Sequence, residues 1–446
     1  MGQQFRITLI ATIGGFLAGL DTGAISKTQN YATFKSKFDL SNIQLGLLVT
    51  ILLLGSMFGS LFSSKLADKY GRKHSIMLAA LIFIFGLFVQ IIGILSFELL
   101  CIGRLVTGVG LGILKAVVPM YLSEVTDPNQ RGKLVSCQQL ALTFGILIAF
   151  VTAMLLENIQ LHCLVDWQVV TLCQLVPASF LFLGMSNLPK SPRWLINVGR
   201  NNEAKSSLSR LKERSFNAVQ MEYLGLLEAF RKQSKGVDLP TIWIKYKKQI
   251  IIGVFIHIFQ QISGINGLMY YSARIYGTML PEYADTLAAT QNILKFVATI
   301  PALFLVDRLG RRSLLLMGSA GCAISLVITA TTMIMPNPQP VIAVVAIFSF
   351  VINFAYSLGP LPWVICSEIF PSNIRSKGMS ICVTVNLTSN LLVSFLSPTL
   401  LAYLGPYTFY IFAINCSLLF IWTFLMMPET KNLSLEEIDA MLSKIK

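Results

Sequence analysis

Long apolar segments, separated by shorter polar ones, make up most of this chain. Each is about 20 residues or longer, the length that an α-helix needs to cross the ~30 Å hydrocarbon core of a bilayer. The apolar residues do not alternate with polar ones as in a membrane β-barrel, so the pattern predicts helices. Twelve segments are long enough to span: about 6–26, 43–64, 75–96, 99–122, 134–156, 167–188, 249–276, 287–306, 313–335, 341–366, 377–402 and 405–427.

Composition places the whole chain in the membrane class. Of its 446 residues, 54% are hydrophobic and 13% are charged, and the mean hydropathy is +0.68. Soluble domains carry roughly 25% charged residues. The sequence therefore predicts an all-α integral membrane protein and excludes a soluble one. The first segment has no small-residue cleavage pattern, so we interpret it as a span and not as a signal peptide.

The net charge of +14 comes from basic residues that are concentrated in alternate loops. They are Lys65, Lys69, Arg72 and Lys73, then Arg131 and Lys133, then many between residues 190 and 248, then Arg308, Arg311 and Arg312, and then Arg375 and Lys377. Cytoplasmic loops of membrane proteins carry such an excess of Lys and Arg. The distribution predicts a multi-pass protein of the cell membrane with both termini in the cytoplasm, and it does not indicate a nucleic-acid partner.

Two motifs occur twice at nearly the same offset. The motif LADKYGRK around Asp68 recurs as LVDRLGRR around Asp307, 239 residues later. The pair Ser123-Glu124 recurs as Ser367-Glu368, 244 residues later. Six spans separate the copies, so both copies face the cytoplasm. We interpret this as a parallel duplication of a six-helix unit, an arrangement in which transporters bind substrate between the halves and rock one half against the other.

The duplication predicts the domain organisation. We expect an N-terminal six-helix bundle at residues 1–188, a cytoplasmic linker with short helices at 189–248, a C-terminal six-helix bundle at 249–427 and a cytoplasmic tail at 428–446. In the linker, apolar residues recur at helical spacing and predict amphipathic helices on the cytoplasmic face. These residues are Leu208 and Leu211 in one stretch and Met221, Leu224 and Leu227 in the next.

The charged residues of the repeated motifs suggest an inner gate made of ion pairs. Pairs between neighbouring helix ends would hold the cytoplasmic side shut and would have to break for it to open. The alternative is that these charges only orient the chain at the membrane edge. The candidates are Asp68, Arg72, Glu124 and Arg131 in the first copy, and Asp307, Arg311, Glu368 and Arg375 in the second.

The polar stretch from Gln260 to Tyr271 lies deep inside the seventh apolar segment. Gln260 follows the basic edge of the segment by about 11 residues, which places it near the bilayer midplane. An unpaired amide in hydrocarbon costs roughly 4–8 kcal/mol, so such groups face protein or a water-filled cavity. Gly264 and Gly267 weaken the helix at this point. We interpret the stretch as half of a binding site for a ligand with many hydroxyls; the alternative is a hydrogen-bonded patch between helices.

Asp21 and Arg104 are charged residues within predicted spans, where charge is rare and usually functional. Asp21 and Arg104 lie at similar depths from the outer ends of the first and fourth segments, so the two side chains can meet. Burial and the Arg104 charge act on Asp21 in opposite directions, which suits a carboxyl that takes up and releases a proton. The alternative is a permanent structural pair.

Two lysines, Lys115 and Lys295, also lie deep in spans. They could pair with acidic groups or bind an anionic substrate such as a sugar acid. The alternative for each is a side chain that reaches to the membrane surface.

Several of these motifs together resemble the sugar porters of the major facilitator superfamily, over essentially the whole chain. The resemblance rests on Gly14-Gly15-Phe16-Leu17 with Asp21-Thr22-Gly23, the two Gly-Arg loops, Gly103-Arg104, Pro119-Met120-Tyr121 with Ser123-Glu124, the segment 189–195, the stretch from Gln260 to Tyr271, Gly359-Pro360-Leu361-Pro362-Trp363 with Glu368, and Pro428-Glu429-Thr430-Lys431 with 434–437.

The resemblance implies the twelve-helix major facilitator fold and assigns roles to individual residues. By position in the motifs, the sugar contacts are Gln139, Gln260, Gln261, Asn266, Trp363 and Asn390, and the outer gate is Tyr270 and Tyr271. Asp21 stands where proton symporters of the family carry Asp and uniporters commonly carry Asn. Lys295 stands where the family usually has a sugar-contacting Asn, which makes it a further candidate for substrate binding and leaves the substrate open.

The sequence therefore predicts a secondary active transporter that imports a monosaccharide or cyclic polyol by proton symport with alternating access. The partners expected are the sugar, protons and the lipid bilayer, with no nucleic acid, and the protein is expected to be a monomer. Alternatives are a transporter of an anionic sugar derivative that uses Lys115 and Lys295, a facilitative uniporter, and a sugar receptor, which the short tail after Pro428 disfavours. No catalytic constellation indicates an enzyme, and no cofactor or metal is expected.

Overall fold

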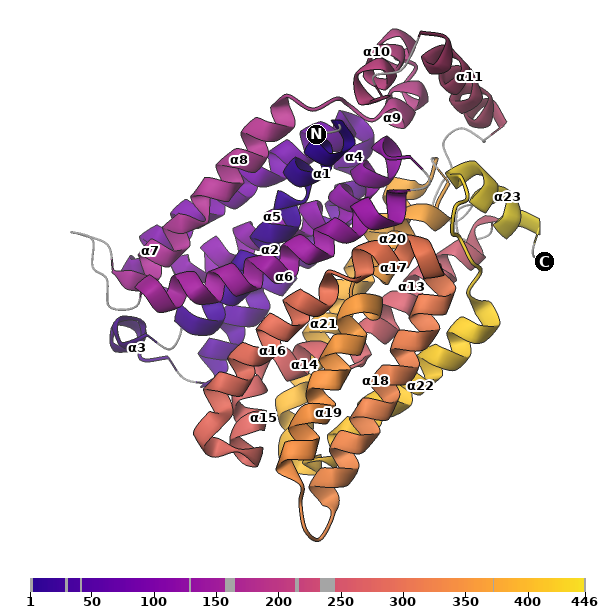
Figure 1. Ribbon diagram of the computed structural model, residues 1–446. Helices are drawn as coiled ribbons and strands as arrows, with labels where there is room; N and C mark the ends of the chain where they lie inside the picture. Colours follow the sequence, from indigo (N-terminus) through magenta and orange to yellow (C-terminus); the bar gives the residue numbers. More distant parts are fainter. Residues whose placement is uncertain are drawn as a thin grey trace. The chain divides into compact units, whose positions relative to one another are not determined.

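The computed structural model describes residues 3–28, 31–40, 42–127, 130–156, 165–212, 216–232, 245–371 and 373–444, and within these ranges every regular element is helical (Figure 1). In the N-terminal part the helices are α1 (Gln3–Ala11), α2 (Ile13–Thr28), α3 (Ala32–Phe38), α4 (Asn42–Ile92), η1 (Gly93–Leu95), α5 (Phe97–Val125), α6 (Arg131–Leu156), α7 (Asp166–Cys173), α8 (Leu175–Ser186), α9 (Pro192–Asn197), α10 (Asn201–Lys212) and α11 (Phe216–Lys232).

The C-terminal part continues this all-helical pattern. Its helices are α13 (Lys247–Ile262), α14 (Ile265–Tyr270), α15 (Ser272–Met279), η3 (Pro281–Tyr283), α16 (Ala284–Thr299), α17 (Ala302–Leu309), α18 (Arg311–Ile334), α19 (Pro340–Asn353), η4 (Phe354–Leu358), α20 (Leu361–Ile369), α21 (Arg375–Leu404), α22 (Tyr407–Met426) and α23 (Leu435–Lys444).

The number of spans agrees with the predicted fold class. Within the described residues ten helices are long and apolar enough to cross a membrane, and the pair formed by Thr286–Thr299 and Ala302–Leu309, bent by 41°, gives another span. One of the ten lies within α4, whose 51 residues would extend about 75 Å at 1.5 Å per residue, more than twice a bilayer core. Because α4 contains a break at Gly71, it provides two spans, and the predicted twelve are confirmed.

The sequence repeat has a matching backbone repeat. Gly71 has φ 81° and ψ 163°, and Gly310 has φ 89° and ψ 164°. Side chains with a Cβ rarely adopt such a φ, so glycine is required where one span turns into the next. The following arginines also match: Arg72 Nη1 donates to the carbonyl of Ala67 at 3.1 Å, and Arg311 Nη1 donates to that of Val306 at 3.2 Å.

By its internal contacts the chain divides into two compact units whose bounds differ from those of the repeat. The first unit contains Met1–Gly253, Trp363–Thr384 and Asn432–Lys446, and the second contains Val254–Pro362 and Val385–Lys431. The first unit thus includes the start of α21 and the C-terminal helix α23. The predicted domain bounds at 188, 248 and 427 follow the repeat and remain a prediction.

The helices between the two repeats, α9, α10 and α11, share a small core of their own (Figure 1). Trp194, Leu208 and Tyr223 are its main buried side chains. Of the apolar residues noted in α11, Leu227 packs on this core, whereas Met221 is 72% exposed and Leu224 is 47% exposed. The buried side chains that α11 contributes to the core are Val219 and Tyr223.

Close packing of α2 on α6 fixes the position of the helix that carries Asp21 (Figure 1). Gly15, Gly19 and Gly23 lie along the contact, and a Cβ on any of them would overlap atoms of α6. Small residues of this kind let two membrane helices approach each other closely. The α2 helix is therefore held against α6 by its backbone over about two turns.

Candidate functional site

The polar stretch in the seventh span lies at a break between two helices of the second unit. Helix α13 ends at Ile262, and α14 begins at Ile265 after Gly264, whose φ is 85°. A Cβ on Gly264 would overlap the ring of Phe412, so both the backbone conformation and the space require glycine. The break places the side chains of Gln260 and Gln261 at the end of one helix and that of Asn266 in the first turn of the next.

These amides form a buried hydrogen-bonded cluster around Asn386 of α21. Asn386 Nδ2 donates to Gln260 Oε1 at 2.7 Å, and Gln261 Nε2 donates to Asn386 Oδ1 at 3.0 Å. Asn266 Nδ2 in turn donates to Gln261 Oε1. Gln260, Gln261 and Asn386 are 4%, 6% and 3% exposed. We refer to Gln260, Gln261, Asn266 and Asn386 as the amide cluster.

The amide cluster uses a backbone carbonyl that a proline leaves without its helical donor. Gln260 Nε2 donates to the carbonyls of Leu358 and Gly359 at 2.7 and 3.2 Å. Pro362 stands four residues after Leu358 and has no N–H, so the Leu358 carbonyl lacks its usual helical donor. The preceding turn η4 is a π-helix, a form that frequently marks functional sites. The irregular backbone between α19 and α20 therefore holds Gln260 in place.

His257, one turn before Gln260, completes the cluster on its inner side. Its Nδ1 lies 2.9 Å from Asn386 Nδ2, and the residue is fully buried. Because an amide nitrogen can only donate, His257 Nδ1 is the acceptor, and the imidazole is neutral with its proton on Nε2. The cluster as a whole therefore contains no formal charge.

Two asparagines of the second unit have unused hydrogen-bonding groups. Asn390 lies one turn after Asn386 on α21, and its Oδ1 accepts from Ser394 Oγ at 3.0 Å. Within the part of the chain that the structure describes, the Nδ2 group of Asn390 and the Oδ1 atom of Asn266 make no hydrogen bond. In contrast, both ends of Gln260 are engaged. Gln260 thus acts as a support, whereas Asn266 and Asn390 can bind further groups.

Lys295 of α16 places a cation in the second unit. The residue is only 7% exposed, and its ammonium group makes no hydrogen bond or ion pair with any described residue.

Tyr271, predicted for the outer gate, is half-buried and donates from its hydroxyl to the carbonyl of Ser394 at 3.3 Å. The side chain of Tyr270 lies outside the described residues.

Two other predicted sugar contacts belong to the first unit. Gln139 is half-buried on α6, and Trp363 is half-buried on α20. Gln138, the neighbour of Gln139, is the more deeply buried of the two glutamines, at 8% exposed. The roles of Gln139 and Trp363 therefore remain predictions.

Asp21 and Arg104 form a buried ion pair in the first unit. Arg104 Nη1 donates to Asp21 Oδ1 at 3.3 Å, and Arg104 Nε donates to the carbonyl of Leu48 at 3.1 Å. The two residues are 1% and 3% exposed. Asp21 Oδ2 has no hydrogen-bond partner among the described residues. Lys115, three turns after Arg104 on α5, lies within electrostatic range of Asp21 without forming an ion pair with it in the described chain.

The repeated charged motifs meet in a buried ion cluster centred on Glu124 in the first unit. Glu124 accepts from Arg72 Nε and Nη2 at 3.2 and 3.0 Å and from Arg375 Nη1 at 3.3 Å. Ser191 Oγ also donates to its carboxylate. Asp68 lies 3.6 Å from Arg72 and accepts from Ser376 Oγ at 2.7 Å. Residues of the second motif copy thus pair with residues of the first.

The second Gly-Arg loop, around Gly310, interacts with residues other than those that contact the first loop. Asp307 pairs with Arg311 Nη1 at 3.0 Å. The Glu429 carboxylate accepts from the backbone N–H groups of Arg311 and Arg312 at 2.9 and 3.0 Å and so caps the start of α18. Arg131 donates to the carbonyl of Leu433 at 3.4 Å, and Glu368 is 1% exposed. The role of Arg131 and Glu368 in an inner gate remains a prediction.

Comparison with known proteins identifies the family. Residues 7–442 match the family described as "Sugar (and other) transporter". The chain belongs to this family of sugar transporters. It is 31% identical to the high-affinity hexose transporter HXT6 of Saccharomyces cerevisiae, over 97% of this chain and 80% of that protein, and 32% identical to the major myo-inositol transporter IolT of Bacillus subtilis, over 97% and 93%.

A solved structure shows the same fold. The structure of XylE from E. coli, a proton:xylose symporter of the major facilitator superfamily bound to 6-bromo-6-deoxy-D-glucose, matches with a TM-score of 0.89 and 27% identity over 98% of both chains. The protein is therefore a multi-pass membrane sugar transporter with the major facilitator fold, as the motifs indicated.

Sequence reasoning missed Asn386, the residue on which most of the transporter's amide cluster converges. A signal was present, because Asn386 is a polar residue inside the eleventh apolar segment and stands four residues before Asn390, on the same helical face. Its partners Gln260 and Gln261 lie 126 and 125 residues earlier in the chain. No local pattern could link residues so far apart.

Proposed function

We propose that this transporter imports a neutral monosaccharide or cyclic polyol by proton symport with alternating access. The observation that carries the substrate class is the uncharged amide cluster, together with the unused groups of Asn266 and Asn390. Sugar hydroxyls both donate and accept hydrogen bonds, and carboxamides offer both functions at one end of a side chain. The names of the relatives agree with this class, because they include carriers of a hexose, of myo-inositol and of xylose.

Within this proposal the substrate-binding residues are those that the motifs indicated. Asn266 and Asn390 contact hydroxyls directly, and Gln261 joins them when its bond to Asn266 exchanges for one to the ligand. Gln260 positions the cluster. Trp363 supplies an apolar wall for the sugar ring, Gln139 adds an amide from α6, and Tyr270 and Tyr271 close the outer side.

Proton coupling is assigned to Asp21 and Arg104. The single contact at 3.3 Å leaves Asp21 Oδ2 without a partner among the described residues, so a proton can bind there without first breaking the ion pair. Protonation removes the attraction for Arg104, whose other bond is to the neutral Leu48 carbonyl. Arg104 is then released to move with α5. Lys115 adds a second positive charge that favours the ionised carboxyl and thus the return of the proton.

Alternating access requires that the inner ion pairs break in each cycle. Glu124 with Arg72 and Arg375 is fully enclosed, so the opening of this cluster exposes three charges to water at once. The pairs around Asp68, Asp307 and Glu368 and the contact of Arg131 belong to the same gate. Within this proposal the protein is a monomer in the plasma membrane, and both of its termini lie in the cytoplasm.

A specific observation favours a second candidate substrate class. The buried ammonium group of Lys295 has no anionic partner in the described chain, whereas Lys115 lies within electrostatic range of Asp21. A buried, unpaired charge is costly, so a carboxylate on the substrate would stabilise Lys295. An anionic sugar derivative is therefore the alternative cargo, and facilitative uniport is the alternative mode.

The test is uptake into proteoliposomes with an imposed inward proton gradient. Radiolabelled xylose, glucose, myo-inositol and glucuronate are supplied in turn, with and without a protonophore. We expect accumulation of a neutral compound above its external concentration, and loss of this excess when the protonophore is added. Accumulation of glucuronate alone would support the anionic alternative, and uptake that only equilibrates would contradict symport.

A further inference from the structure

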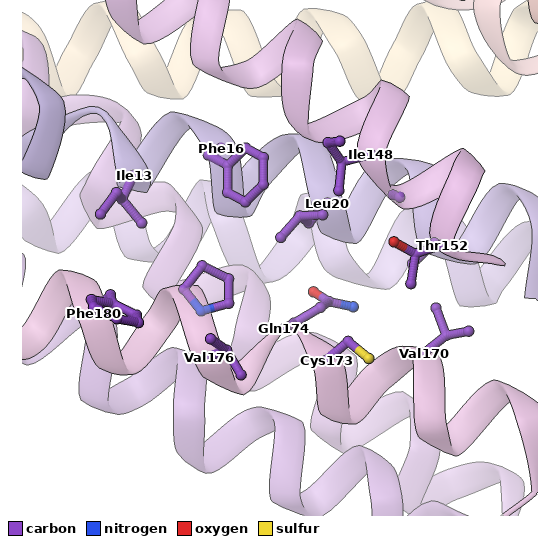
Figure 2. Close-up of a pocket in the computed structure, with 13 residues that line it drawn as sticks. Ile13, Phe16, Leu20, Ile148, Thr152, Val170, Cys173, Gln174, Val176 and Phe180 are labelled. Carbon is purple, nitrogen blue, oxygen red and sulfur yellow. The ribbon is translucent and has the colours of Figure 1, made fainter. Parts of the chain in front are cut away.

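A cavity lies in the first unit, and no residue of the amide cluster lines it. It has a volume of about 420 Å³, is partly open, and is lined by residues of α2, α6, α7 and α8, all of which belong to membrane spans (Figure 2). This volume is within the range of cavities that bind small organic ligands. The walls are almost wholly apolar, with Phe16, Leu20, Ile148 and Phe180 among them. An apolar cavity of this kind carries no information about a ligand by itself.

One polar group in this cavity is not explained by packing. Gln174 lines it and is only 4% exposed. Its side-chain oxygen is buried and has no hydrogen-bond partner, and its amide nitrogen makes no hydrogen bond with any described residue either. The amides of Gln260, Gln261 and Asn386 are in contrast all paired. An amide without hydrogen-bond partners in an apolar site is costly. A ligand that forms hydrogen bonds with the Gln174 amide would remove this cost.

The local backbone turns Gln174 toward this cavity. Helix α7 ends at Cys173 and α8 begins at Leu175, which leaves Gln174 at the junction. Pro177 has no N–H, so it cannot donate to the carbonyl of Cys173 four residues earlier. Figure 2 shows the Gln174 amide beside Cys173, with the hydroxyl of Thr152 on the facing helix. The cavity therefore has a polar spot at one point of an otherwise apolar wall.

The depth of Gln174 restricts the ligand. The span that contains it begins at Asp166, and eight residues at 1.5 Å each place Gln174 about 12 Å into the bilayer core. A phospholipid head group stays at the interface, and its acyl tails have no hydrogen-bonding group. A charged ligand would need a counter-ion, and among the described residues no Lys, Arg, Asp or Glu lines this cavity. What fits is an uncharged apolar molecule with one group that both donates and accepts.

We propose that this cavity is a binding site for a membrane-dissolved alcohol or phenol, whose hydroxyl pairs with the Gln174 carboxamide. The hydroxyl hydrogen is donated to Oε1, and the hydroxyl oxygen accepts from Nε2. The apolar body of the ligand lies against Phe16, Ile148 and Phe180. This site shares no residue with the proposed transport site and does not depend on which sugar the protein carries.

The experiment uses the full-length protein in lipid nanodiscs and a matched pair of photoactivatable probes. One probe is octanol with a diazirine on its third carbon, and the other is its methyl ether, which has nearly the same apolar body but cannot donate a hydrogen bond. Peptide mass spectrometry after illumination locates the adducts. We expect adducts on the wall of the cavity with the alcohol, and about fivefold fewer with the ether, which corresponds to the loss of one hydrogen bond.

Two variants test the site from different directions. In Gln174→Leu the alcohol and the ether are expected to label the cavity equally. Val176→Trp fills the cavity from a position that is 61% exposed, and it is expected to abolish labelling by both probes while Gln174 is intact. Labelling of Ile324, which is 61% exposed on α18, serves as the reference for unspecific contact from the bilayer. Equal labelling of the wild type by both probes, or a preference for the alcohol that survives in Gln174→Leu, would overturn the proposal.

Discussion

The two polar groups inside the spans are built on opposite principles. The Asp21–Arg104 pair consists of two charges joined by one contact of 3.3 Å, and one carboxylate oxygen is left without a partner among the described residues. The amide cluster has no net charge, and its members share hydrogen bonds of 2.7 to 3.0 Å with one another and with a carbonyl that Pro362 leaves without a helical donor. One group is sparse and charged, and the other is dense and neutral.

This difference indicates which of the two groups, the Asp21–Arg104 pair or the amide cluster, can change its interactions during transport. A charge with one weak contact changes its interactions completely when a single proton binds. A neutral cluster in which each amide supports the next is rigid, because one lost bond leaves several buried groups unsatisfied. We therefore assign the energy-coupling step to the first group and recognition of a neutral, many-hydroxyl substrate to the second.

The largest effect is expected from Asp21→Asn. The amide keeps the size of the carboxyl but removes its charge, so Arg104 loses its counter-ion permanently. Uphill, proton-driven accumulation in proteoliposomes should vanish, whereas exchange of labelled for unlabelled sugar across the membrane should persist. If the variant still concentrates sugar against a gradient, the assignment of coupling to Asp21 is wrong.

The next largest effect is expected from Asn386→Leu in the amide cluster. The change leaves Gln260 Oε1 and Gln261 Nε2 without their partner, at about 1–3 kcal/mol for each buried group. If the cost of one of these two groups falls on sugar binding, the apparent Km for sugar should rise by about 5- to 150-fold, while proton dependence is retained. Asn415→Leu is the matched control: within the described ranges, the one side-chain hydrogen bond of Asn415 goes to the Phe259 carbonyl of the same α13 helix, at 2.9 Å. An equal rise in Km for both variants would indicate general destabilisation of α13 and not recognition.

A pair of lysine variants separates neutral from anionic cargo. Lys295→Met removes a buried cation that has no ion-pair partner among the residues that the structure describes. If the cargo is neutral, as we propose, its Km changes little; an anionic cargo loses a charged hydrogen bond worth about 1.5–3 kcal/mol. Lys115→Met acts next to Asp21 instead and should shift the pH dependence of uptake without changing the preference among sugars. Competition of uptake by xylose and by glucuronate in both variants distinguishes these outcomes.

The smallest effect is expected from Ser394→Ala. Ser394 Oγ donates to Asn390 Oδ1, and its loss frees this amide to turn without leaving a buried charge. One neutral hydrogen bond contributes about 0.5–1.5 kcal/mol, so the Km for sugar should change by less than about tenfold, and the neighbouring Ser397→Ala should change it less. A loss of transport as large as that of Asn386→Leu would show that Asn390, and not Asn386, organises the cluster.

Much of this architecture could be predicted from the sequence, for physical reasons. Membrane spans can be predicted from short stretches of sequence, because each stretch that crosses the bilayer must be apolar over about 20 residues. The Gly71 and Gly310 turns are recorded in the repeated motif, and Asp21 is conspicuous in an apolar segment. Partners that are distant in sequence are not recorded in this way. The hydrogen bond between Asn386 and Gln260 depends on tertiary packing, which no short stretch of sequence contains. The same holds for the face of α11 that is buried, which includes Tyr223 and leaves Met221 exposed.

The pairing of Arg375 with Glu124 has a consequence for biosynthesis. Glu124 leaves the ribosome 251 residues before Arg375, and the first unit also incorporates Trp363–Thr384 and the segment after Asn432. A nascent chain that ends before residue 363 therefore contains a buried carboxylate with only one of its two arginines. We therefore expect the first unit to reach its final packing only after its late segments, Trp363–Thr384 and Asn432–Lys446, have been made.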